Sequence, residues 1–272
     1  MKMRKTIYIL LGSLLVAHTA LSQETQGYPF KAPSISEAPS GPVGDAVRQG
    51  HSLLTETRLM LPNNVGNGMN CTSCHLNGGT KPHAAPFAGL WGVFPAYSAR
   101  VAKVITLADR VNDCFERSMN GKALGYESTE MISILTYIQF ISTGVPTGSS
   151  VKGRGEGKID QNLIPDPVRG KKIYAEKCAS CHGAEGLGLK VEANKYVFPP
   201  LWGDDSFNDG AGMARPYTAA AFVIANMPIG QENSLTEQEA LDVSQYFTYQ
   251  PRPVFAGKKN DWPKGGRPKD AR

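Results

Sequence analysis

Two copies of one cysteine–histidine motif are the clearest chemical signal in the sequence. Cys-x-x-Cys-His occurs at residues 71–75 and again at 178–182. In this spacing two thiols can add to the vinyl groups of a haem while the adjacent imidazole binds its iron. A zinc site would need a second pair of ligands for each motif, and the sequence does not supply a second Cys pair to each. We therefore predict two covalently bound haems, held by Cys71, Cys74, His75, Cys178, Cys181 and His182.

A fifth cysteine, Cys114, has no partner in either motif. It falls between the first haem motif and the last helix of its half, and Met227 falls at the equivalent place in the second half. Thiolate ligation would lower the potential of an iron and methionine ligation would raise it. Other readings stay open: Cys114 as a plain buried cysteine, or other residues as iron ligands. Those residues are Met213 for the second haem and, for the first, Met119, Met60, Met69, His51 and His83.

The segments around the two motifs also repeat, which indicates two copies of one small domain. Helical spacing of apolar residues at positions 50–54 and 170–174 predicts a helix ahead of each motif. A Pro-rich segment with Trp-Gly follows each motif, at 85–92 and 198–203. Each copy should end in a helix. We predict these helices at 129–142, with Ser128 as N-cap, and at 237–249, where Thr236 and Glu239 can form a capping box.

The beginning of the chain reads as an export signal. A basic start is followed by an uncharged apolar run and small residues near Ser22, which predicts a cleaved signal peptide over 1–22. The apolar run is too short to span a membrane, so we expect an exported chain in the periplasm without a membrane span. Loss of the three basic residues of this segment lowers the formal net charge from +5 to +2. Such a balance does not suggest a nucleic-acid partner.

Composition then divides the remaining chain. We predict an N-terminal haem domain over 23–144, a Gly-rich linker over 145–158 and a C-terminal haem domain over 159–257. Residues 258–272 form a polar, basic tail that should be frayed or laid along the surface.

The segment around Cys114 carries a family resemblance. Residues 110–122 read Arg-Val-Asn-Asp-Cys-Phe-Glu-Arg-Ser-Met-Asn-Gly-Lys, and with the two haem motifs they resemble the dihaem thiosulfate dehydrogenases of the TsdA family. The resemblance implies a mostly α fold of two cytochrome c-like domains in tandem. It further implies His75/Cys114 ligation of a catalytic haem and His182/Met227 ligation of an electron-transfer haem, because Asn226 stands where some members have a ligating lysine.

The family reaction couples two thiosulfates to tetrathionate and releases two electrons, and some members also run the reverse. Thiosulfate is a compact dianion, so two of them can meet only where fixed cations offset their repulsion. Arginine forks suit sulfonate oxygens well. We therefore expect substrate contacts from Arg100, Arg110, Arg117 and Lys122, with Gln139 a weaker candidate and Lys103 a solvated surface residue.

Other functions compete with this interpretation. A non-catalytic dihaem electron carrier would explain both motifs but not Cys114 and its arginines. A dihaem peroxidase would need acid–base residues that the sequence does not obviously provide, and a cysteine-ligated haem subunit of a sulfur-oxidation complex would need a docking surface for a carrier protein. For the enzyme we expect a periplasmic cytochrome, or a similar protein, as electron acceptor.

Overall fold

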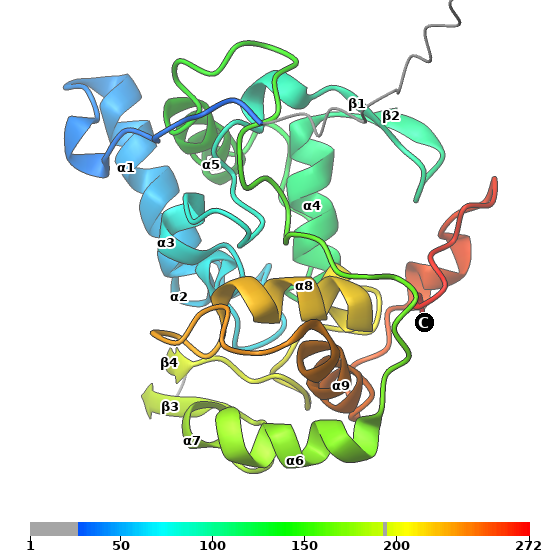
Figure 1. The fold of residues 1–272 in the computed structure, drawn as a ribbon. Helices are drawn as coiled ribbons and strands as arrows, with labels where there is room; N and C mark the ends of the chain where they lie inside the picture. The colour runs from blue at the N-terminus through cyan, green and yellow to red at the C-terminus, as the bar shows by residue number, and fades with distance from the viewer. Residues whose placement is uncertain (1–26, 193–194) are drawn as a thin grey trace, which may run out of the picture.

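The computed structural model describes residues 27–192 and 195–272. The predicted signal peptide therefore lies outside the described residues. Within these ranges no helix is long and apolar enough to cross a membrane. The chain folds into two halves that lie one above the other, and both are built mainly of helices, as predicted (Figure 1).

In the described part of the chain, the first half contains five α-helices and one short hairpin. They are α1 (Pro42–Thr55), α2 (Thr57–Met60), α3 (Leu76–Gly79), β1 (Ala96–Ser98), β2 (Lys103–Ile105), α4 (Leu107–Arg117) and α5 (Thr129–Phe140). The second half contains α6 (Pro167–Lys177), α7 (Ala179–His182), β3 (Leu189–Glu192), β4 (Lys195–Phe198), α8 (Pro216–Asn226) and α9 (Glu237–Thr248). Both hairpins are antiparallel. Short 3₁₀ turns occur at Ile35–Glu37, Cys71–Ser73, Trp91–Val93, Gly212–Ala214 and Ala256–Asn260.

Side-chain caps fix where the key helices begin. The Ser128 hydroxyl accepts a hydrogen bond from the Met131 amide at the start of α5. Thr236 and Glu239 form the predicted capping box at the start of α9. These bonds satisfy amides that a helix N-terminus leaves unpaired. The two predicted terminal helices are confirmed, and α5 and α9 end one or two residues earlier than expected.

In each half the first helix packs against the last at a glycine. A β-carbon on Gly50 of α1 would lie 2.1 Å from the carbonyl oxygen of Ser133 in α5. The same atom on Gly170 of α6 would lie 2.0 Å from the carbonyl oxygen of Asp242 in α9. Backbone therefore approaches backbone at both crossings, and the matching position of the two glycines shows that both halves are assembled in the same way.

We expect Gly50→Ala and Gly170→Ala each to lower the free energy of unfolding by about 1–3 kcal/mol, because the added methyl group meets rigid backbone. Gly125→Ala is the matched control, since a β-carbon there would meet only the Ser128 side chain at 3.8 Å. Denaturant unfolding of the haem-loaded proteins measures the effect. Equal stability of all three variants would contradict close packing at the two crossings.

The segment between the halves is held by specific bonds. The Gly148 amide donates to the Gly92 carbonyl at 2.9 Å, and the Ala85 amide donates to the Gly155 carbonyl at 3.0 Å. Residues 145–158 thus lie along the first half before the chain enters the second. Composition alone predicted only a linker.

The two halves meet across buried amide side chains. Asn67 of the first half donates from Nδ2 to the carbonyl of Ser206 in the second at 3.0 Å. Asn208 of the second half donates to the carbonyl of Glu116 in the first at 2.9 Å. Both side chains are almost fully buried. Because a buried polar group without a partner is costly, these bonds fix how the halves sit against each other.

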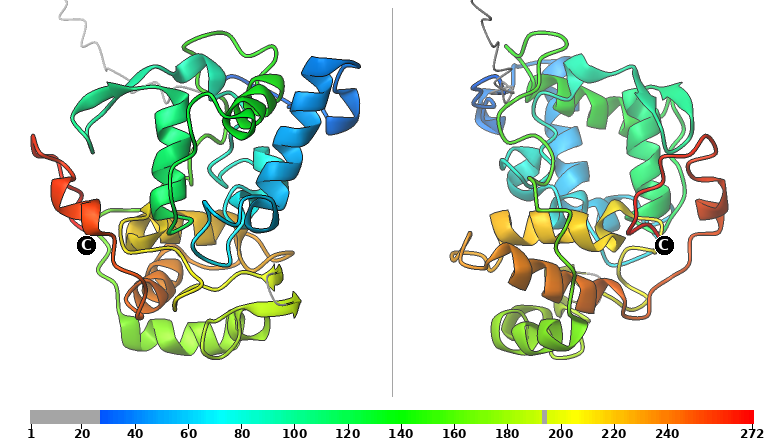
Figure 2. Two further views of the ribbon diagram at one scale, coloured as in Figure 1. Left: turned by 180° about the vertical axis from the view of Figure 1, so that it is seen from behind. Right: turned by 45° about the vertical axis from the view of Figure 1, so that its right-hand side comes forward.

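The C-terminal segment returns to the first half. In Figure 2 this segment, coloured red, leaves the second half and rises along the flank of the first. The Trp262 amide donates to the Arg100 carbonyl at 2.7 Å. The sequence predicted a tail that is either frayed or laid along the surface, and this bond fits the second alternative, although no local pattern pointed to Arg100 as the partner.

Candidate functional site

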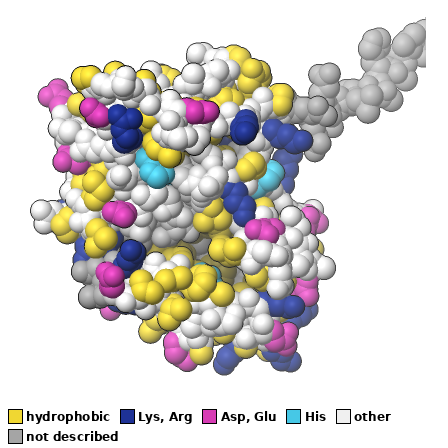
Figure 3. Space-filling model, turned by 90° about the vertical axis from the view of Figure 1, so that its left-hand side faces the viewer, with side chains coloured by type: hydrophobic (Ala, Val, Ile, Leu, Met, Phe, Trp, Pro, Cys, Tyr) yellow, Lys and Arg dark blue, Asp and Glu magenta, His cyan; other side chains and the backbone are white. Residues whose placement is uncertain are grey.

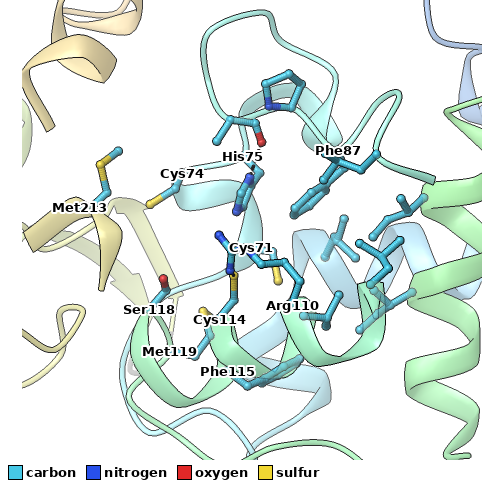
Figure 4. A pocket seen from close by; sticks show the side chains of 18 of the residues that line it. Cys71, Cys74, His75, Phe87, Arg110, Cys114, Phe115, Ser118, Met119 and Met213 are labelled. Atoms are coloured by element: carbon cyan, nitrogen blue, oxygen red, sulfur yellow. Dashed lines mark hydrogen bonds between the residues drawn. The ribbon is translucent and has the colours of Figure 1, made fainter. Parts of the chain in front are cut away.

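The first Cys-x-x-Cys-His motif lines a cavity of about 250 Å³ in the first half. Figure 4 shows Cys71, Cys74 and His75 facing it, with Phe87 beside the imidazole and Cys114 opposite. Much of the remaining wall is apolar. It includes Leu54, Leu107, Phe115, Ile134 and Ile138. We call this space the first haem cavity.

Both motif histidines are held in the tautomer that an iron ligand requires. Nδ1 of His75 lies 2.6 Å from the Ala85 carbonyl oxygen, and Nδ1 of His182 lies 2.9 Å from the Pro199 carbonyl oxygen. A carbonyl oxygen only accepts, so Nδ1 carries the proton and Nε2 keeps its lone pair. Burial also lowers the pKa of His75 to about 4 and lowers that of His182. Each ring is therefore neutral and able to bind a metal.

The motif thiols are unpaired and placed in apolar surroundings. Burial raises the pKa of Cys71 to about 11 and that of Cys74 and Cys178 to about 12. Among the described residues no cluster of three His, Cys, Asp or Glu side chains is arranged to hold a metal ion. Two neutral thiols and a neutral imidazole around an apolar cavity fit a covalently bound haem.

The second motif lines a larger cavity of about 490 Å³ in the other half, which we call the second haem cavity. Figure 3 views the molecule from the left-hand side of Figure 1 and shows hydrophobic side chains bordering a hollow in its lower half. Met227 lines this cavity alone, whereas Met213 lines both haem cavities. Cys74 and Phe207 are also shared by the two. The two cavities are therefore neighbours, separated by single side chains.

The other candidate iron ligands differ in position. Met119 lines the first haem cavity and Met69 lines both. Met60 is 39% exposed and lines neither. His51 and His83 also lie outside both cavities. Only Met69, Met119 and Met213 thus remain as rivals by location.

Cys114 lies on α4 between the first haem cavity and a polar cavity of about 510 Å³, which we call the outer cavity. Helix α4 begins at a capping box of Thr106 and Asp109, which sets its phase. Arg110 lies one helical turn before Cys114 and donates from Nη1 to Cys114 Sγ at 2.9 Å. The electrostatic interaction with the neighbouring Cys114 side chain raises the pKa of Arg110 further. Sulfur and guanidinium thus face both cavities together.

Arg100 and Arg117, both predicted to bind substrate, are largely engaged by the protein itself. Arg117 forms a two-point ion pair with Asp261 at 2.8 and 2.9 Å, and its Nε donates to Asp113 at 2.5 Å. Arg100, in the turn of the β1–β2 hairpin, donates to the Gly210 carbonyl at 3.1 Å and lies 3.6 Å from Asp261. Both line the outer cavity, but Arg117 has its donors committed to carboxylates and to the Gly210 carbonyl.

The structure places two other predicted contacts outside the site. Gln139 is exposed and lines none of the three cavities, because Ile134 and Ile138 take the face of α5 that meets the first haem cavity. Lys122 lies in the turn after α4, exposed, with its amide bonded to the Asn64 carbonyl. The geometry therefore gives no support to a substrate contact from either residue, and their roles stay predictions. Lys103, predicted to be solvated, is an exposed residue at the rim of the outer cavity.

The sequence analysis did not identify several residues that line the cavities. Ser118 lies one turn after Cys114 and lines both the first haem cavity and the outer cavity, a position that the helical spacing of 114 and 118 could have indicated. Glu156 of the linker lines the same two cavities. Arg215 and Trp262 line the outer cavity from distant parts of the chain, and no local pattern points to them.

Fold and site together define a two-domain c-type cytochrome in which an arginine-paired cysteine borders one haem cavity. The sequence model described as "SoxA/TsdA, cytochrome c domain" matches residues 63–147, and that of cytochrome c matches residues 167–249. The thiosulfate dehydrogenase of Psychrobacter arcticus is 49% identical over 243 residues, 89% of this chain and 74% of that protein. That of Allochromatium vinosum is 42% identical over 256 residues, 93% of this chain and 94% of that protein. The chain belongs to the thiosulfate dehydrogenase family.

A solved relative shares the arrangement. The thiosulfate dehydrogenase TsdBA of Marichromatium purpuratum, in its as-isolated form, superposes with a TM-score of 0.79 at 41% identity over 83% of this chain. The chain spans half the length of that solved protein. Two cytochrome c domains in an enzyme of this family imply two haem c groups.

Proposed function

We propose that this protein couples two thiosulfates to tetrathionate and passes out the two electrons released. The observation that carries the proposal is the position of Cys114. Its sulfur lies 2.9 Å from the Arg110 guanidinium, at the boundary between the first haem cavity and the outer cavity. A sulfur nucleophile beside a fixed cation suits an anionic sulfur substrate.

The two haems would be held by the six motif residues, and we propose that Cys114 would complete the iron ligands with His75 in the first cavity and Met227 with His182 in the second. When bound, they supply one-electron acceptors that take up the two electrons and pass them on. The shared walls of the two cavities support transfer between them, because Met213 and Phe207 line both.

Cys114 forms and breaks the sulfur–sulfur bonds. Thiosulfate enters the outer cavity with its sulfonate near Arg110, and its terminal sulfur bonds to the Cys114 sulfur with loss of two electrons. The product is a cysteinyl thiosulfonate, Cys–S–S–SO₃⁻. The terminal sulfur of a second thiosulfate then attacks the outer sulfur of that disulfide bond. Tetrathionate leaves and the Cys114 thiolate is restored.

Run backwards, the same steps reduce tetrathionate, so we propose both directions. We also propose that the protein is exported to the periplasm and delivers electrons to a cytochrome there. The basic start and the apolar run of the first 22 residues support export.

The test of the proposal is steady-state reduction of ferricyanide by the haem-loaded protein with thiosulfate, together with oxidation of a reduced dye by tetrathionate. Sustained turnover in either direction is expected. Two intact haem spectra without turnover in both assays would contradict the proposal and favour a non-catalytic electron carrier.

Met227 gives a separate prediction about the second haem. We expect Met227→Leu to remove the spectroscopic signature of methionine ligation and to lower the potential of the second haem by on the order of 100 mV, because the thioether favours the ferrous state. Met213→Leu is the control in the same cavity and should leave the ligation unchanged. Loss of the signature in the Met213 variant alone would assign the ligand to Met213.

A further inference from the structure

Arg215 brings an unpartnered cation from the second half into the outer cavity. It directly precedes α8, whose first residue is Pro216. Its Nε is buried and has no hydrogen-bond partner, and within residues 27–192 and 195–272 its guanidinium forms no ion pair. A buried donor left without a partner destabilises the folded protein. An arginine kept in this state at a cavity wall is suited to an anionic ligand.

The other arginines of the cavity are already engaged. Arg117 is neutralised by Asp261 and Asp113, whereas Arg110 lies against the Cys114 sulfur and 3.5 Å from the same Asp113 carboxylate. Burial and the nearby charge of Arg117 lower the pKa of Arg100, and Arg215 is close enough to add a smaller effect in the same direction. The cavity therefore has cationic groups on two walls, Arg110 on α4 of the first half and Arg215 ahead of α8 of the second.

We propose that Arg215 binds the sulfonate of the second thiosulfate, and thus one of the two sulfonate ends of tetrathionate. The proposal rests on the function proposed above. Two dianions must approach until their terminal sulfurs react, and one cation beside Cys114 can offset the charge of only the first. Arg215 faces the same cavity from the opposite domain, and its planar fork can bind two sulfonate oxygens at once.

One partial step isolates this role from turnover. Tetrathionate reacts with the Cys114 thiolate to give the cysteinyl thiosulfonate and one thiosulfate, and this exchange needs no external oxidant or reductant. We call this reaction the labelling of Cys114. Its rate is measured from the increase in intact mass of the haem-loaded protein during incubation with tetrathionate. Because both sulfonate ends must be bound while the central bond breaks, Arg215 contributes to this rate.

We expect Arg215→Gln to slow the labelling at sub-saturating tetrathionate by about tenfold to a hundredfold, the loss of one charge-assisted hydrogen-bonded contact, and to raise the KM for thiosulfate. Arg215→Lys should recover part of the rate, because it keeps the charge and loses the two-point geometry. Lys103→Gln is the matched control. It removes a charge from the exposed rim of the same cavity and should change the rate less than about twofold.

The outcomes separate the two proposals. Labelling of Arg215→Gln at the wild-type rate, with unchanged KM, would overturn the role of Arg215 alone. Failure of the wild-type protein to become labelled or to turn over would instead overturn the proposed function. If Arg215→Gln loses its native haem spectra, Arg215→Lys is compared with the wild-type protein instead. Labelling of Arg215→Lys at the wild-type rate, together with an unchanged KM, would equally overturn the proposal.

Discussion

Cys114→Gly should lose thiosulfate turnover by at least about a thousandfold while both haems remain attached. The six motif residues are untouched by this change, so attachment does not depend on Cys114. The loss follows because the Cys114 sulfur is the atom that carries the thiosulfonate intermediate. Without this nucleophile the covalent intermediate cannot form. Steady-state ferricyanide reduction measures the rate, and a pyridine haemochrome assay measures haem content.

Met119→Leu is the control for this experiment, because Met119 is buried and lines the same haem cavity near the end of α4. It should retain most of the activity and should still become labelled by tetrathionate. A Cys114→Gly variant with wild-type turnover would show that the sulfur of Cys114 takes no part. Loss of activity in Met119→Leu alone would show that the essential sulfur atom is that of Met119.

Asp261→Ala should destabilise the protein by about 3–5 kcal/mol, since it leaves the Arg117 charge buried without its main partner. The side chains of Arg117 and Asp261 are only 6% and 4% exposed, so water cannot replace the lost bonds without rearrangement. Denaturant unfolding of the haem-loaded protein measures the change. The variant should also detach Trp262 from the Arg100 carbonyl, which protease sensitivity near the C-terminal segment would report.

The control is Asp45→Ala, which breaks an ion pair with Arg48 whose side chains are 46% and 73% exposed. Such a surface pair contributes at most about 1 kcal/mol. The experiment also decides the role of Arg117. If Arg117 binds substrate rather than the C-terminal segment, Asp261→Ala would leave stability unchanged and lower the KM for thiosulfate.

Features of the sequence with short-range causes were predictable. The two haem motifs and the capping residues Ser128 and Thr236 depend on residues within a few positions of each other. The bond between Arg110 and Cys114, one turn apart, was not predicted but has an equally local cause. A helical period is enough to place such residues on one face.

Features that depend on the packing of distant segments were not predictable. Gln139 and Ile138 are neighbours in sequence, and only the packing of α5 decides that Ile138 faces the haem cavity. Arg117 looked like a substrate ligand because its partner, Asp261, is 144 residues away in a tail of unremarkable composition. Arg215 was overlooked for the same reason, since its cavity is formed only when the halves meet.

The return of residues 255–262 to the first half limits how this molecule can change during evolution. Its two domains look like modules that could be exchanged, since each holds one haem motif and one pair of crossing helices. Yet Gly210 and Asp261, from beyond the first domain, hold Arg100 and Arg117 in place. Recombination that supplied a different second domain would therefore expose two arginines and open a wall of the outer cavity. We expect exchange to preserve function only when the C-terminal segment is inherited together with the β1–β2 hairpin and α4.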